Sequence, residues 1–125
     1  MKKAVHLEAE EFRSGVFIND KDDFQFLPFS NEAQVFPVRG IVVGDYNHDG
    51  VKDLLLAGNN YAVRAQSGRY DAGKGLLLLQ KKGAGFSVDL NTGFHANKDA
   101  RKLIGIDNFI IVGNNNDKIQ LFRIN

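Results

Sequence analysis

The segment 45–53, DYNHDGVKD, constrains the fold of this chain more than any other part of its sequence. It lies between two short apolar segments, GIVVG at 40–44 and DLLLAG at 53–58. Strands that are apolar at consecutive positions are normally covered on both faces. The sequence therefore predicts two buried neighbouring strands joined by an acidic loop.

The spacing of oxygen donors in this loop is typical of a calcium site. Calcium takes six to eight oxygen ligands, and a short loop supplies them from alternate residues around a sharp turn, which Gly50 permits. The candidate ligands are Asp45, Asn47, Asp49, the backbone carbonyl of Val51, and Asp53. We therefore expect Ca²⁺ as the cofactor, bound where the two strands meet.

Three alternatives bear on this interpretation. An EF-hand would carry a bidentate Glu at the twelfth place, where this chain has Leu56 inside an apolar strand, so that class of site is excluded. Magnesium is disfavoured because it prefers strict octahedral sites that retain several waters. A solvated acidic turn without metal, as expected for 20–23, is the remaining alternative.

Most of the remaining sequence predicts strands. Only residues 4–12 could form a short helical turn, ended by Ser14 and Gly15. Segments 15–19 and 24–29 flank a polar turn and predict a hairpin, in which Pro28 suggests an edge strand. Further strands are expected at 75–82, 86–90, 102–106, 108–113 and 118–124.

The strand segments repeat along the chain. GIVVGDYNHDGVKDLLLAGNN and KLIGIDNFIIVGNNND share two apolar strands followed by Gly-Asn-Asn, although the second copy lacks the acidic loop. Repeated antiparallel four-stranded units are typical of β-propeller blades. We expect one all-β domain over 1–125, comprising an outer half-blade (12–30), a complete blade (38–92) and inner blade strands (101–124). These amount to about two blades, which cannot close a ring.

The segment GDYNHDGVKDLLLAGN resembles the FG-GAP or VCBS repeat of integrin α-like propellers. Together with SGVFIND, SGRYDAGKGLLLL and NNNDKIQLFRIN, it makes residues 12–125 similar to the C-terminal part of bacterial VCBS-repeat proteins related to the ASPIC/UnbV group. The resemblance implies a propeller, calcium in blade loops, and a non-catalytic role in adhesion or protein interaction. It also implies a location outside the cytoplasm: extracellular, periplasmic or on the cell surface. The chain is then an excised piece, a stand-alone product or a decayed copy.

The long loop 59–74 is a second candidate site. It contains aromatic surfaces, cationic donors and a carboxylate that could hold a glycan or peptide: Tyr61, Arg64, Arg69, Tyr70 and Asp71. Loops of this length tend to be functional or mobile. In the alternative, structural interpretation, Arg69 pairs with Asp71 and Tyr70 packs against the blade.

Composition narrows the classes of function. The net charge is +1 without a basic stripe, so nucleic acid is not expected as a partner, and no apolar run is long enough to insert into a membrane. The three histidines have no recognisable nucleophile context, so we expect no enzyme. The alternative function is structural: one chain's N-terminal hairpin completes another chain's C-terminal strands, giving a homo-oligomer through blade edges and faces. A hydrolase site at the propeller mouth rests on fold analogy alone.

Overall fold

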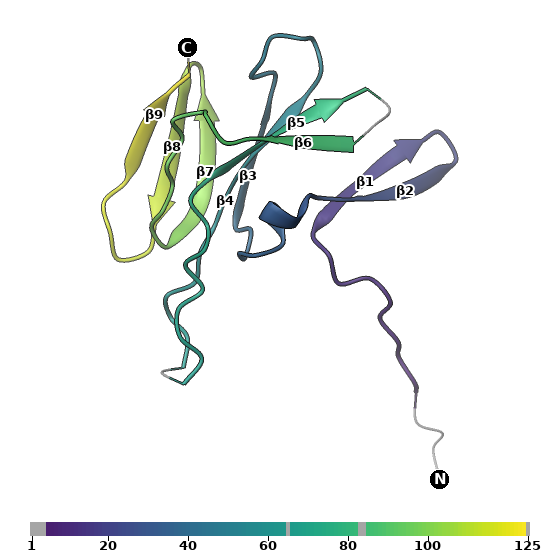
Figure 1. The fold of residues 1–125 in the computed structure, drawn as a ribbon, viewed down its shortest axis with the longest axis horizontal. Coiled ribbons are helices and arrows are strands. Elements are labelled where there is room, and N and C mark those ends of the chain that lie inside the picture. The colour runs from purple at the N-terminus through teal and green to yellow at the C-terminus, as the bar shows by residue number, and fades with distance from the viewer. Residues whose placement is uncertain (1–4, 65, 83–84, 125) are drawn as a thin grey trace.

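The computed structural model describes residues 5–64, 66–82 and 85–124 and is an all-β structure of three antiparallel sheets (Figure 1). The first sheet is a hairpin of β1 (Gly15–Asp20) and β2 (Asp23–Pro28). The second has the order β3 (Gly40–Gly44), β4 (Asp53–Ala57), β5 (Leu76–Lys81) and β6 (Gly85–Asp89). The third has the order β7 (Ala100–Ile106), β8 (Phe109–Asn114) and β9 (Gln120–Arg123). A 3-10 turn, η1 (Asn31–Ala33), follows the hairpin.

The four-stranded sheet lies between the other two, as Figure 1 shows. On one face, Leu55, Leu77 and neighbouring side chains pack against Ile110 and Val112 of β8. On the other face, Leu54, Leu56, Leu76 and Leu78 pack against Phe29, Ala33 and Phe36 from the segment after β2. Every residue of β4 is buried, which confirms that this apolar strand is covered on both faces.

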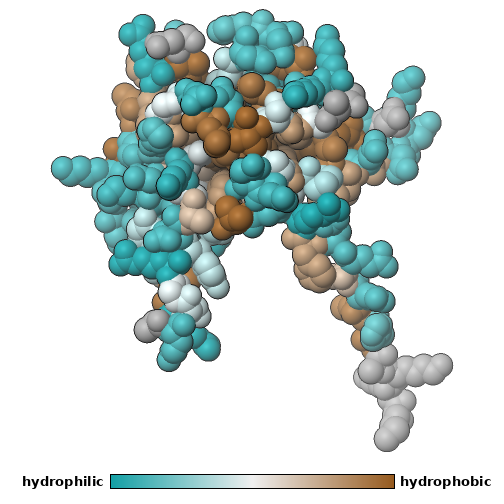
Figure 2. Space-filling view, in the orientation of Figure 1, coloured by the Kyte–Doolittle hydropathy of each residue, from teal (hydrophilic) through white to brown (hydrophobic). Residues whose placement is uncertain are grey.

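The expectation that segment 40–44 is also covered on both faces is wrong, because the covering of the four-stranded sheet is incomplete at β3. Ile41 and Val43 are paired with the buried Leu56 and Leu54, but their own side chains are 48% and 59% exposed. The outward face of the third sheet is also open, with Ile104 and Leu121 exposed. Figure 2 shows hydrophobic surface between polar side chains on the face it views. Apolar side chains therefore face solvent both at β3 of the central sheet and on the outward face of the third sheet.

The strand segments expected from the sequence are confirmed to within two residues at each end. The turn of the first hairpin is shorter than expected: strand pairing extends to Asp20 and Asp23, so Lys21 and Asp22 alone form it, with Lys21 at φ 56°. The η1 turn was not predicted. Within the described residues no helix is long and apolar enough to cross a membrane.

The predicted helical turn at 4–12 is wrong over the residues described. Residues 5–12 are irregular and exposed, and Ala4 lies outside the described residues. Helices this short are marginal in water without tertiary contacts. In addition, Val5, Leu7 and Ala9 are spaced two residues apart, so a helix would not gather them on one face.

Candidate metal-binding loop

The acidic loop is the connection between β3 and β4 (Figure 1). The pairing of Gly44 with Asp53 closes it at its base. Gly50 has φ 81° and His48 has φ 60°, so the backbone turns twice through the left-handed region within three residues. That conformation suits glycine and brings alternate side chains back over the loop. The predicted role of Gly50 is thus confirmed.

Three of the five predicted ligands are brought together. The amide of Asp49 donates to Asp45 Oδ1 at 3.1 Å and to Asn47 Oδ1 at 3.2 Å, and the amide of Gly50 donates to Asp45 Oδ2 at 2.9 Å. Asn47 Nδ2 donates to Asp49 Oδ2 at 2.8 Å. The side chains of Asp45, Asn47 and Asp49 therefore share one side of the loop.

The carboxylate of Asp49 also accepts a hydrogen bond from the amide of Val51, at 2.8 Å. The hydrogen bond from Asn47 lowers the pKa of Asp49 most, followed by the bond from Val51, and the charge of Lys82 adds to the effect. A lowered pKa keeps this exposed carboxylate anionic, as a calcium ligand must be. Lys82 and Lys81, with Asn47 and Asp49, line an adjacent cavity of about 460 Å³.

The fifth predicted ligand, Asp53, is fully buried at the first position of β4. Its Oδ2 accepts from the amide of Tyr46 and its Oδ1 from the amide of Gln80 in β5, both at 2.9 Å. Asp53 thus joins the loop to the next strand. Burial, followed by the charge of Asp53, raises the pKa of Tyr46.

Among the described residues, no group of three His, Cys, Asp or Glu side chains is close enough to hold a metal ion. This agrees with the engagement of Asp53 elsewhere, because its oxygens face backbone amides of Tyr46 and Gln80. Asn47 and the Val51 carbonyl, two of the predicted ligands, are not acidic groups. Each carboxylate oxygen offers about two lone pairs, so one hydrogen bond leaves an oxygen able to ligate.

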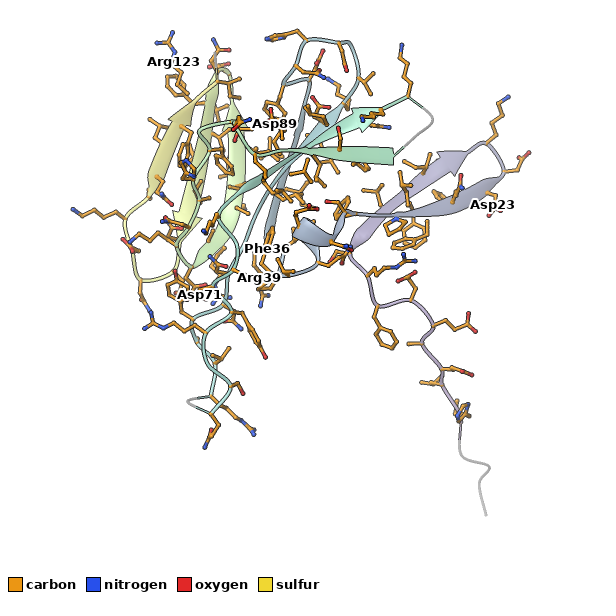
Figure 3. All side chains as sticks on the ribbon, viewed as in Figure 1. Asp23, Phe36, Arg39, Asp71, Asp89 and Arg123 are labelled. Carbon is orange, nitrogen blue, oxygen red and sulfur yellow. The ribbon has the colours of Figure 1, made fainter. Side chains whose placement is uncertain are left out.

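The structure brings together only some of the residues predicted for the second candidate site, on loop 59–74. Tyr61 and Arg69 come together, with the guanidinium 4.9 Å from the ring centroid, and the Tyr61 hydroxyl donates to the carbonyl of Asn97. Arg64, Tyr70 and Asp71 are exposed (Figure 3 shows Asp71), and Tyr70 is tied to Asn60 through the backbone alone. Of the ion pairs between described residues, none joins Arg69 to Asp71. Arg69 covers one face of the aromatic ring that we expected to stack on a ligand.

Two buried polar residues escaped the sequence analysis. Asn59 is fully buried; its Nδ2 donates to the carbonyls of Gly73 and Lys98 at 2.8 and 2.9 Å, and its Oδ1 accepts from the Gly73 amide. Asp99 is 2% exposed and accepts from Arg101 and Asn115. The repeated Gly-Asn-Asn was the available signal, since buried asparagines that bind backbone recur where loops are pinned.

The same guanidinium of Arg101 also donates to Asn60 Oδ1 at 3.1 Å. The second Asn of each Gly-Asn-Asn, Asn60 or Asn115, therefore belongs to one network centred on Asp99 and Arg101. This network joins the ends of β4 and β8.

No family model, curated protein or solved structure matches this chain.

Proposed function

We propose that the chain is a non-catalytic calcium-binding module in which Ca²⁺ at loop 45–53 stiffens the junction of β3 and β4. The observation that supports this best is the convergence of Asp45, Asn47 and Asp49 at alternate positions of one tight loop. Oxygen ligands of this kind suit a hard divalent cation. No reaction is assigned to the ion.

The proposed coordination uses the side chains of Asp45, Asn47 and Asp49 and the carbonyl of Val51. Asp53 completes the set from the base of the loop. Calcium would offset the repulsion between the carboxylates and, through Asp53, connect the loop to β5. Because the site is exposed and next to Lys82, we expect an affinity near 10⁻⁴ M, in the range of about 10⁻⁴ to 10⁻³ M typical of extracellular modules.

The architecture that agrees with this function is a partial β-propeller of the FG-GAP or VCBS kind. In it, β3–β6 is the complete blade, β1–β2 an outer half-blade, and β7–β9 the inner strands of the next blade. The packing of β7 against β3 supports this reading. An extracellular, periplasmic or cell-surface role in binding a protein or glycan follows from the family resemblance and is part of the proposal.

Calorimetric titration of Ca²⁺ into chelator-stripped protein tests the proposal. We expect one site per chain, lost in Asp49→Ala and retained in the control Asp22→Ala, which removes an exposed carboxylate from the β1–β2 turn. Asp49 is exposed, so its replacement leaves the core intact. In Lys82→Gln, removal of the nearby positive charge should tighten binding by about two- to threefold at low salt and less at high salt.

The absence of heat and of any shift in melting temperature with the unmodified chain would refute the proposal. Binding by Asp49→Ala with the affinity of the parent would refute it equally. A Mg²⁺ titration under the same conditions should give weaker binding, because magnesium is reluctant to exchange its waters for a loop of this geometry.

A further inference from the structure

The segment before the first hairpin, residues 5–12, is an arm that pairs with no strand in the described part of the chain. Figure 1 shows it extending away from the sheets. Val5, Leu7 and Phe12 are 82%, 87% and 85% exposed. Val5, Leu7 and Ala9 alternate with His6, Glu8 and Glu10, which is the pattern of a strand with one apolar face. Exposed apolar area of this kind favours burial against a surface.

In the part of the chain that the structure describes, β9 is an edge strand of the third sheet. The central sheet has four strands, whereas β7–β8–β9 has three, and β9 is paired with β8 alone among the strands described. The other edge of β9 leaves backbone donors and acceptors open to a strand from elsewhere. An extended peptide that adds to such an edge gains main-chain hydrogen bonds and places alternate side chains in neighbouring pockets.

A pocket lies beside this free edge. It is a cavity of about 300 Å³ between the second and third sheets, with an apolar wall and with Asp89 and Arg123 among its polar lining groups. Phe122 and Ile124, from β9 and the residue after it, line it together with Phe94. Figure 3 shows Asp89 and Arg123 at the same end of the two sheets. A strand added to β9 would direct every second side chain toward this cavity, because side chains alternate between the faces of a sheet.

The charges of the arm and the third sheet are complementary. Residues 5–12 contain Glu8, Glu10 and Glu11 and neither Lys nor Arg. Strands β7, β8 and β9 contain Arg101, Lys102 and Arg123 and no acidic residue. Opposite charges on the two elements favour their association and disfavour pairing between two arms or two β9 edges.

We propose that the arm of one copy of this chain adds to β9 of a second copy as the fourth strand of its third sheet. Leu7 occupies the cavity beside Phe122. Glu8 and Glu10 lie on the opposite face of the sheet, where Lys102 and Arg123 alternate with the inward-facing Leu103 and Phe122. The arm leaves from the hairpin on one face of the central sheet, whereas β9 belongs to the sheet on the opposite face, so a second copy is the occupant. Reciprocal exchange gives a closed dimer, and sequential exchange gives rings or filaments. This proposal does not depend on calcium binding.

Sedimentation of the full chain from about 1 µM to about 1 mM tests the proposal, and we expect concentration-dependent association. Leu7→Asp should weaken it at least ~10-fold, equivalent to about 1.4 kcal/mol, because a charged side chain would lie against the apolar wall of Phe94, Phe122 and Ile124. Val35→Asp is the matched control, since Val35 is 63% exposed outside the arm, and it should associate like the parent. Both sites are exposed, so both variants should fold.

Two further experiments test whether the arm and β9 are the surfaces that meet: an exchange of charges between them and the binding of a peptide with the sequence of the arm. Arg123→Glu should weaken association, and Glu8→Lys with Glu10→Lys should restore it in that background. A labelled peptide of residues 5–12 (VHLEAEEF) should bind the Leu7→Asp chain, and the same peptide with Asp in place of Leu should not. A monomer at every concentration, association unaffected by Leu7→Asp, or failure of the peptide to bind would each overturn the proposal.

Discussion

Asp99 is buried, and burial alone would disfavour the charged form of its carboxyl group. Burial raises its pKa, but the hydrogen bonds from Asn115 and Arg101 and the charge of Arg101 outweigh that effect, and the net pKa is lowered. Asp99 is therefore anionic in the folded chain, and its ion pair with Arg101 is shielded from solvent on the carboxylate side. Removing one partner of such a pair leaves a buried group unsatisfied, which is costly.

The lowered pKa of Asp99 predicts a pH dependence of stability. A carboxyl whose pKa is lower in the folded than in the unfolded chain contributes stability above its unfolded pKa, about 3.9, and that contribution is lost as the pH falls through the folded value. The stability advantage of the parent over Asp99→Asn should therefore be largest near neutral pH and shrink below about pH 4. Urea unfolding of both proteins across this range measures it.

Asp71→Asn is the control for this pH experiment, because Asp71 is exposed and joins no ion pair among the described residues. Its stability difference from the parent should stay small at every pH. Equal stability of Asp99→Asn and the parent at neutral pH would contradict the role assigned to Asp99.

At the scale of single elements, two hairpins of the chain differ in the loop that joins their strands. The pair β3–β4 is joined by the long acidic loop, whereas β7–β8 is joined by a tight turn of Asp107 and Asn108, with Asp107 at φ 48°. Asp and Asn tolerate that left-handed conformation better than most residues. Equivalent apolar strands thus pair with and without the acidic loop, so the loop is an addition to the hairpin.

The end of β4 depends on a close approach of backbone. A Cβ added at Gly58 would meet the carbonyl of Pro37 and lie 2.6 Å from the amide of Arg39. These are backbone atoms that cannot rotate away. The amide of Arg39 is also held in place, because it donates a hydrogen bond to the carbonyl of Ala57. Gly58→Ala should therefore cost about 3 kcal/mol, the upper end of the range for overpacking, measured by denaturant unfolding.

Gly68→Ala is the control for this steric effect. Gly68 has φ 68° with no atom within 4 Å of an added Cβ, so only the left-handed backbone disfavours the change. We expect a cost of about 1 kcal/mol, with no change in the cooperativity of unfolding. A smaller cost for Gly58→Ala than for Gly68→Ala would contradict the packing at the end of β4.

At the scale of the whole molecule, two hydrophobic clusters on the two faces of the central sheet hold the fold together. From the acidic loop, Tyr46 packs against one of these clusters, whereas the side chains of Asp45, Asn47 and Asp49 belong to neither. Removing calcium should consequently leave the far-ultraviolet circular dichroism unchanged. At ten times its dissociation constant the ion adds only about 1.4 kcal/mol of stability.

For a chain of 125 residues this corresponds to a fall in melting temperature of roughly 3–6 °C when a chelator is added. Differential scanning calorimetry with and without Ca²⁺ measures it, and Asp49→Ala, which lacks the proposed site, should show no shift. Unfolding of the parent in chelator would mean that the ion defines the fold, contrary to the packing of the two clusters.

The sequence by itself determined the strand pairs, the acidic loop and its turn at Gly50. These depend on local patterns: runs of apolar residues, and a glycine among alternating oxygen donors. Even the error at residues 5–12 was local, because a two-residue alternation was read as a helical turn. The repeated Gly-Asn-Asn was also visible in the sequence, but the contacts that its asparagines make could not be predicted from it.

Only the tertiary structure decided which oxygens and charges meet. Asp53 accepts from the amide of Gln80 in β5, and Arg69 stacks on Tyr61 in place of pairing with Asp71. The pair of Asp99 and Arg101 binds the second Asn of both Gly-Asn-Asn segments. The open edge of β9 and its cavity also exist only once the sheets are stacked. Most of these contacts join residues far apart in the chain, and their partners depend on how the sheets pack, which no local pattern encodes.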